Sequence, residues 1–144
     1  ATRESILENF NNANTTKCQT KYLSADVTAN GAIGDLGFNN LTIGKKYRIE
    51  LSVFLLVVND PLAYIEYKNN AVIVTRFSCG DSSGSSNCNS SSVGSFTTAT
   101  DTLILSATSL SGGANILYGN GSKGETYATL CELPETVIET TEFN

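Results

Sequence analysis

The sequence predicts an all-β protein: an antiparallel β-sandwich or jelly roll that begins with a short helical or irregular segment. Short apolar runs alternate with segments rich in Thr, Ser, Asn and Gly, which is typical of strands joined by frequent turns. A helical spacing of apolar residues occurs near the N-terminus and not later in the chain. The length of 144 residues is that of one domain. We therefore expect about eight to ten strands packed in two layers.

The N-terminal segment, residues 1–19, is expected to be separate from the jelly-roll domain, residues 20–144. Ile6, Leu7 and Phe10 share one face of a helix. Such a helix has about two turns and is marginal on its own. Two interpretations stay open: a frayed terminus, or a small plug that docks into a partner.

The clearest strand is KKYRIELSVFLLVV, residues 45–58. Every second residue from Tyr47 to Val57 is apolar, and the residues between them are at first charged or polar, which predicts one buried and one wet face. From Phe54 onward the second face is apolar as well, through Phe54, Leu56 and Val58. A subunit interface or overlying loops would cover that face, and the interface is the preferred interpretation.

Turn signals divide the rest of the chain. NDP at residues 59–61 predicts a turn, and KNN at residues 68–70 predicts the tip of a hairpin, because Asn tolerates positive φ. CGDSSGSSNCNSSSVGS, residues 79–95, is expected to be a long polar loop, and another turn is expected near Asp101. The last expected strands are ETYATLCELP and ETVIETTEF, and Pro134 ends the first of them.

Composition excludes several classes of function. The net charge is −5 and only 16% of the residues are charged, with one basic cluster at residues 45–48, so no nucleic-acid partner is expected. The longest apolar run, residues 53–58, is far shorter than the roughly 18 residues needed to cross a membrane, so no membrane insertion is expected. The chain has no His, which removes Ser–His–Asp and Cys–His catalysis and His-based zinc sites. We expect no enzyme activity, no metal and no cofactor.

Four cysteines are present. Cys79 and Cys88 bracket a short polar stretch and are candidates for a disulfide, which would indicate an oxidising environment. Free thiols and a zinc site are the alternatives, and no CxxC pair supports zinc. Cys131 lies in an apolar context and is expected to be a buried small hydrophobic residue. Cys18 is expected to be a free thiol, although its pairing with Cys131 is not excluded.

Carboxylates offer two weaker candidates. Glu132, Glu135, Glu139 and Glu142 cluster late in the chain, and paired carboxylates can hydrolyse glycosides, but a solvated face is the preferred interpretation. Asp81 can contribute to a calcium site, yet no D-x-D-x-D pattern surrounds it.

Three segments resemble a module that recurs in phage virion proteins: LSADVTANGAIGDLGFNNLTIGKKYRIELSVFLLVV, YIEYKNNAVIVTRF, and TDTLILSATSL with ILYGNGSKGETYATLCELPE. The shared pattern is an L-T-I-G-K-x-Y-R strand entry, a hairpin that ends in a polar loop, and a closing T…L-x-E-L-P strand. The match spans residues 20–143. The chain looks like the jelly-roll heads of tail fibres in phages of cyanobacteria and other bacteria, which often resemble trimeric tumour-necrosis-factor-like or complement-like domains.

This resemblance implies a non-enzymatic virion structural protein, a homotrimeric tail fibre, knob or decoration assembled in the bacterial cytoplasm. Its implied partners are other virion proteins and a glycan or protein of the host surface. The alternatives are a monomeric carbohydrate-binding module, disfavoured by the absence of Trp, and a glycosidase that uses the late glutamates.

The resemblance and the apolar pattern together give candidate contact residues. The trimer interface candidates are Phe54, Leu56, Val58 and Tyr127. Receptor contact is expected on exposed loops, at residues 59–64, 80–92 and 111–123. The individual receptor-contact candidates are Tyr64, Asp81, Asn89 and Tyr118, although core or interface packing is the simpler role for both tyrosines.

Overall fold

The computed structural model describes residues 17–108, 110, 115–119 and 125–134. These residues form seven strands and one short 3-10 helix: β1 (Cys18–Tyr22), β2 (Gly31–Ala32), η1 (Gly34–Leu36), β3 (Lys46–Asn69), β4 (Val72–Thr97), β5 (Ile104–Thr108), β6 (Ile116–Leu117) and β7 (Tyr127–Glu132). The predicted N-terminal helix lies outside the described residues, and so does the expected last strand, ETVIETTEF. The strand β1 begins at Cys18, before the expected domain start at residue 20.

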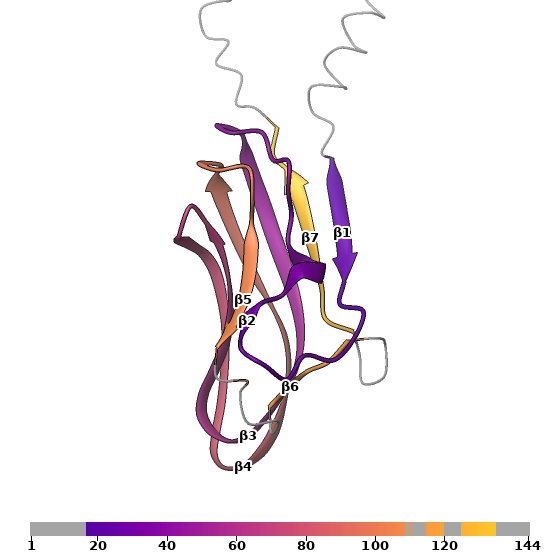
Figure 1. The fold of residues 1–144 in the computed structure, drawn as a ribbon, viewed down its shortest axis with the longest axis vertical. Coiled ribbons are helices and arrows are strands. Elements are labelled where there is room, and N and C mark those ends of the chain that lie inside the picture. Colours follow the sequence, from indigo (N-terminus) through magenta and orange to yellow (C-terminus); the bar gives the residue numbers. More distant parts are fainter. Residues whose placement is uncertain (1–16, 109, 111–114, 120–124, 135–144) are drawn as a thin grey trace, which may run out of the picture.

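One long hairpin, formed by β3 and β4, organises the fold. The two strands pair from Lys46–Thr97 at the open end to Asn69–Val72 at the tip. The pairing register shifts between residues 58 and 63 of β3, and there both strands bend back on themselves (Figure 1). The hairpin therefore supplies two strands to each of two layers.

The two layers form an antiparallel β-sandwich of the jelly-roll type, as predicted. The first layer contains β1, β7, residues 46–58 of β3 and residues 85–97 of β4, in that order, with β6 alongside β3. The second layer contains residues 72–81 of β4, residues 62–69 of β3, β5 and β2. All of these pairs are antiparallel.

The predicted alternation in the first half of β3 is confirmed. Every second side chain from Tyr47 to Val57 is buried against the second layer, with at most 4% of its surface exposed. Burial of each aliphatic side chain in this row contributes roughly 1.5–3 kcal/mol. Phe54, Leu56 and Val58 lie on the opposite, outer face and are half-buried.

Two sequence predictions about β3 and β4 are wrong. Residues 59–61 form no chain-reversing turn between separate strands, because β3 continues through them as a bulged bend. Within this bend Asn59 adopts a left-handed backbone conformation, with a φ of 48°. Residues 79–95 are no loop, because they belong to the continuous strand β4. Backbone pairing to the strongly patterned β3 overrides the low strand propensity of the Ser, Asn and Gly residues.

The two halves of β4 close one side of the sandwich by contacting each other. The hydroxyl groups of Thr75 and Ser92 form a hydrogen bond, and Ser92 Oγ also donates to the carbonyl oxygen of Arg76, at 3.1 Å. The backbone at Gly94 lies directly against the backbone at Val74. A side chain at position 94 would therefore have no room.

Two buried polar side chains near the hairpin tip tie the second layer to neighbouring segments. Asn69, only 4% exposed, accepts from Ala99 N at 2.8 Å and donates to the carbonyl oxygen of Thr102 at 2.9 Å. Tyr67 donates its hydroxyl to the carbonyl oxygen of Leu36 at 2.6 Å, which holds η1 over the core. Burial raises the pKa of Tyr67 far above its ordinary value, so the hydroxyl stays a donor.

Among the described residues, no helix has the length and apolar character needed to cross a bilayer.

The hairpin tip offers a stability prediction. As predicted, Asn-rich sequence forms the tip, but Ala71 joins Asn70 in the left-handed region, with φ of 62° and 52°. A two-residue turn of this kind favours Gly at its second position, because Ala is strained there. We expect Ala71→Gly to raise the free energy of unfolding by about 0.5–1 kcal/mol, measured by urea denaturation. A loss of stability would contradict the strain.

Candidate functional site

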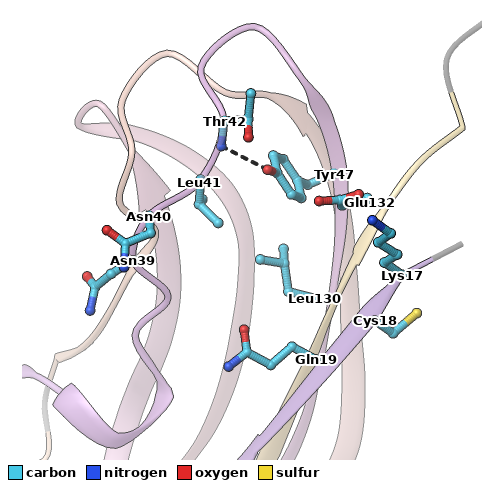
Figure 2. Close-up of a pocket in the computed structure, with 10 residues that line it drawn as sticks. All are labelled: Lys17, Cys18, Gln19, Asn39, Asn40, Leu41, Thr42, Tyr47, Leu130 and Glu132. Carbon is cyan, nitrogen blue, oxygen red and sulfur yellow. Dashed lines mark hydrogen bonds between the residues drawn. The ribbon is translucent and has the colours of Figure 1, made fainter.

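A polar cleft opens at the end of the sandwich where β1 begins and β7 ends (Figure 2). Its volume is about 240 Å³. One wall is the connection between η1 and β3, and the other is formed by β1 and β7, with the start of β3 behind them. The lining residues are Lys17, Cys18, Gln19, Asn39, Asn40, Leu41, Thr42, Tyr47, Leu130 and Glu132.

Backbone hydrogen bonds hold the loop wall of the cleft in place. Thr42 N donates to the hydroxyl oxygen of Tyr47 at 2.9 Å, and Leu41 N donates to the carbonyl oxygen of Asp101 at the same distance. Asn40 has a φ of 58°, which Asn tolerates better than other non-Gly residues. The ring of Tyr47 stacks on Phe96, with ring centroids 5.8 Å apart. The buried tyrosine thus fixes the loop on which Asn39 and Asn40 stand.

The cleft can bind hydrogen-bonding groups. Three amide side chains, Gln19, Asn39 and Asn40, each offer a donor and an acceptor, and all three residues are exposed. Glu132 adds a carboxylate that pairs with Lys45, with Nζ 3.1 Å from Oε2. This arrangement suits a ligand that presents both donors and acceptors. The three amides were not selected from the sequence, because they come from two distant segments with no shared motif.

The structure corrects the prediction for Cys18 and Cys131. These residues are joined by a disulfide between β1 and β7, with their Cα atoms 4.0 Å apart. Cys131 pairs with Arg48 on β3 and lies on the outer face, half-buried, whereas its neighbour Leu130 is directed into the core. Figure 2 shows the Cys18 sulfur directed away from the cleft. Cys131 is therefore neither a free thiol nor a core residue.

Cys79 and Cys88 are also joined by a disulfide, with their Cα atoms 6.5 Å apart. Cys79 lies opposite Ala63 in the second layer, and Cys88 lies opposite Leu55 in the first. Both partners are fully buried core residues. The bridge thus links the two layers near the bend of β4, whereas the sequence placed it across the ends of a loop.

The trimer interface candidates share one surface with further apolar residues. On the outer face of the first layer, Tyr127 lies opposite Tyr22, with ring centroids 5.7 Å apart. Leu56 lies opposite Ile116, and Tyr118 donates its backbone N–H to the carbonyl oxygen of Phe54 at 2.8 Å. We call this surface the outer apolar face. Its residues are Tyr22, Phe54, Leu56, Val58, Ile116, Tyr118 and Tyr127.

The receptor-contact candidates do not come together. Tyr64 lies on the outer face of the second layer, beneath the Arg76 guanidinium at 4.4 Å from the ring centroid. Asn89 is exposed opposite Phe54 in the first layer, and Tyr118 is half-buried next to the same residue.

Asp81 lies at the bend of β4, apart from these two groups. It accepts from Ser86 Oγ at 2.7 Å and from Ser83 N at 3.2 Å, and these hydrogen bonds lower the pKa of its carboxyl group. In the described part of the chain, no three His, Cys, Asp or Glu residues lie close enough together to hold a metal ion. Of the late glutamates, Glu132 pairs with Lys45, and Glu135, Glu139 and Glu142 lie outside the described residues.

Comparisons with known proteins place the chain in no family. No family model matches it, and no curated protein matches it. Among solved structures, the C-terminal domain of the sugar-binding protein EclA is 10% identical, with a TM-score of 0.36 over 81% of this chain and 76% of that chain. Eiger TNF from S. frugiperda is 14% identical, with a TM-score of 0.41 over 71% of this chain and 73% of that chain. Latent PorU from Porphyromonas gingivalis is 6% identical, with a TM-score of 0.49 over 83% of this chain and 13% of that chain. At these scores the likenesses carry no argument about what the chain does.

Proposed function

We propose that the chain is a non-enzymatic structural module that assembles as a homotrimer in a phage virion appendage. The observation that carries this proposal is the outer apolar face. Tyr22 is 56% exposed and Tyr127 is 36% exposed, although both are large aromatic residues on neighbouring strands. Phe54, Leu56 and Val58 extend the same face on β3. A continuous apolar surface of this kind favours association with another protein surface.

The polar neighbours of the face are compatible with a specific interface. Ser52 lies opposite Tyr127 on β3, and Asn89 lies opposite Phe54 on β4. An apolar centre with a polar rim is typical of protein interfaces. Because three identical copies can present the same face around a threefold axis, a closed trimer would bury it.

The virion assignment is supported by the resemblance of residues 20–143 to phage jelly-roll heads, and the two disulfides are compatible with it. Disulfides persist in oxidising surroundings and are rare in the cytosol. A virion is assembled in the host cytoplasm but acts outside the cell. In this proposal the disulfides form after release, and the module contacts other virion proteins and the host surface.

A charge placed on the outer apolar face tests the trimer. We expect sedimentation velocity to give a trimer for the wild-type chain and a monomer for Leu56→Glu and Tyr127→Glu, because a carboxylate cannot be buried unpaired. Ile104→Glu is the matched control: Ile104 is 50% exposed on the outer face of the second layer, so its variant should stay trimeric. A folded wild-type monomer, or equal mass for all variants, would overturn the trimer.

The cleft supports a second candidate function, a carbohydrate-binding module. Sugar hydroxyl groups both donate and accept hydrogen bonds, as do the exposed amides of Gln19, Asn39 and Asn40. A monomer whose glycan binding, detected by saturation-transfer NMR, disappears in Asn39→Ala would favour this function. A chain that stays silent towards glycans would remove it.

A further inference from the structure

The strand β1 is a free edge of the first layer. It pairs with β7 on one side and with no other strand of the described chain. Leu23 N donates to the carbonyl oxygen of Thr126, and Glu132 N donates to that of Lys17. Because hydrogen-bonding direction alternates along an antiparallel strand, the backbone groups of Cys18, Thr20 and Tyr22 are directed away from β7. This edge can accept a further strand.

Three side-chain contacts hold the edge strand β1 against β7. The Cys18–Cys131 disulfide fixes its beginning, and the ring of Tyr22 packs at a tilt against that of Tyr127 at its end. Between them, the hydroxyl oxygens of Thr20 and Thr129 are 2.9 Å apart. No Pro, Gly or bulge interrupts β1. Pro and bulges are among the features that keep exposed edges from pairing with other chains.

The charges of β1 match those of the residues that follow β7. Lys21 lies in β1 and Lys17 directly precedes it, four positions away, so they share one face of the extended chain, and β1 contains no acidic residue. Residues 135–144, ETVIETTEFN, contain three glutamates and no basic residue. Glu135 and Glu139 have the same spacing of four. Thr, Val, Ile and Phe fill most of the remaining positions, and these residues favour strands.

We propose that residues 135–144 of a second copy of this chain add a strand to the free edge of β1. In either strand direction, one register places Glu135 and Glu139 opposite Lys17 and Lys21. That register also places Val137 opposite Gln19. This pairing is separate from the outer apolar face and does not depend on the trimer.

The place where the chain leaves the sandwich favours a second copy over the same copy. Pro134 follows β7 at the end of the sandwich where β1 begins, as the bond from Glu132 N to Lys17 O shows (Figure 1). To reach its own free edge, residues 135–144 would have to cross the start of β1 immediately after Pro134. The chain also enters β1 at this end, through Lys17, and connections that cross each other at one edge of a sheet are avoided.

A proline in the edge strand gives a direct test. The N–H of Thr20 is directed away from β7, so Thr20→Pro removes an outward donor and leaves the pairing with β7 intact. Thr20→Ala is the matched control, because it loses the same hydroxyl group and keeps the N–H. We expect a fluorescent peptide of residues 135–144 to bind the full chain, and Thr20→Pro to weaken this binding by about tenfold or more while Thr20→Ala does not. Equal binding by both variants, or no binding by the wild-type chain, would overturn the proposal.

Charge exchange tests the register. We expect Lys17→Glu to weaken peptide binding by about fivefold at low salt, and one peptide variant, Glu135→Lys or Glu139→Lys, to restore it. Restoration by the Glu135 variant indicates parallel strands, and restoration by the Glu139 variant indicates antiparallel strands. If neither peptide restores binding, the charge-matched pairing is wrong. Lys21 is left unchanged, because it donates to the carbonyl oxygen of Gly37 at 2.7 Å.

Self-association of the full chain separates this proposal from the trimer. In a Leu56→Glu background, in which the outer apolar face is disabled, the chain should associate weakly and reversibly at concentrations above those at which it sediments as a monomer, and excess peptide should reverse that association. If this residual association is absent, or if the peptide leaves it unchanged, the second-copy pairing fails whatever the trimer experiment gives. If Leu56→Glu leaves the mass unchanged but excess peptide still reverses the association, the trimer fails and the edge pairing stands.

Discussion

Removal of the Cys18–Cys131 disulfide is expected to lower the free energy of unfolding by about 4–5 kcal/mol, against about 2–3 kcal/mol for removal of Cys79–Cys88. The two bridges join residues 113 and 9 positions apart. A crosslink restricts the unfolded chain more when it closes a longer loop. The longer bridge also joins β1 to β7, so it covalently retains the first described strand of the sandwich.

Two double variants measure this difference. Cys18→Ala/Cys131→Ala and Cys79→Ala/Cys88→Ala make the same chemical change, so urea denaturation of each against the wild-type chain compares the bridges directly. Cys79 and Cys88 are partly buried against the core, so their removal adds a small packing loss to the entropic one. An equal or larger loss for Cys79→Ala/Cys88→Ala would show that the loop length does not dominate.

The two bridges differ in how far the sequence indicates them. Cys79 and Cys88 are close in sequence and flanked by small polar residues, so a local bridge could be inferred. The partner of Cys18 depends on the register between β1 and β7, which places it directly opposite Cys131. Nothing local to either cysteine encodes that register. The flanking leucines of Cys131 suggested burial, yet a strand alternates its faces, and Leu130 is directed inward while Cys131 is directed outward.

The fold was predicted best where hydrophobic periodicity is strong. The alternation from Tyr47 to Val57 identified the inner row of β3, and the outer position of Phe54, Leu56 and Val58 follows from the same alternation. The continuity of β4 was missed, because residues 79–95 have the composition of a loop. Their strand conformation comes from pairing with β3, which is a long-range effect.

The cleft could be predicted only in part. Tyr47 was identified as an inward residue of the strand, but its role in fixing Thr42 depends on how the loop before β3 folds back. Gln19 and Asn39 lie on opposite walls and are brought together by the packing of β1 beside that loop. Contacts of this kind arise from tertiary packing, and no residue spacing in the sequence carries them.

The closure of the sandwich at β4 leads to a second large effect, at Gly94. A Cβ atom at this position would overlap the carbonyl oxygen of Val74 and would also lie 3.0 Å from the Cβ atom of Thr75. Both obstacles belong to the facing half of β4, and a backbone carbonyl cannot move away by changing a rotamer. Gly94→Ala must therefore push apart the two halves of β4. We expect a loss of about 2–3 kcal/mol in the free energy of unfolding.

Gly84→Ala is the matched control for this effect. It makes the same substitution in the same strand, but its new Cβ atom would be 3.6 Å from the nearest atoms, the carboxylate oxygens of Asp81. Neither glycine has a positive φ, so backbone strain does not separate the two variants. We expect Gly84→Ala to change stability by less than about 0.5 kcal/mol in the same urea titration. If Gly94→Ala is equally mild, the halves of β4 do not pack in direct contact. The layers would then be held together at this side by the Cys79–Cys88 bridge rather than by backbone packing.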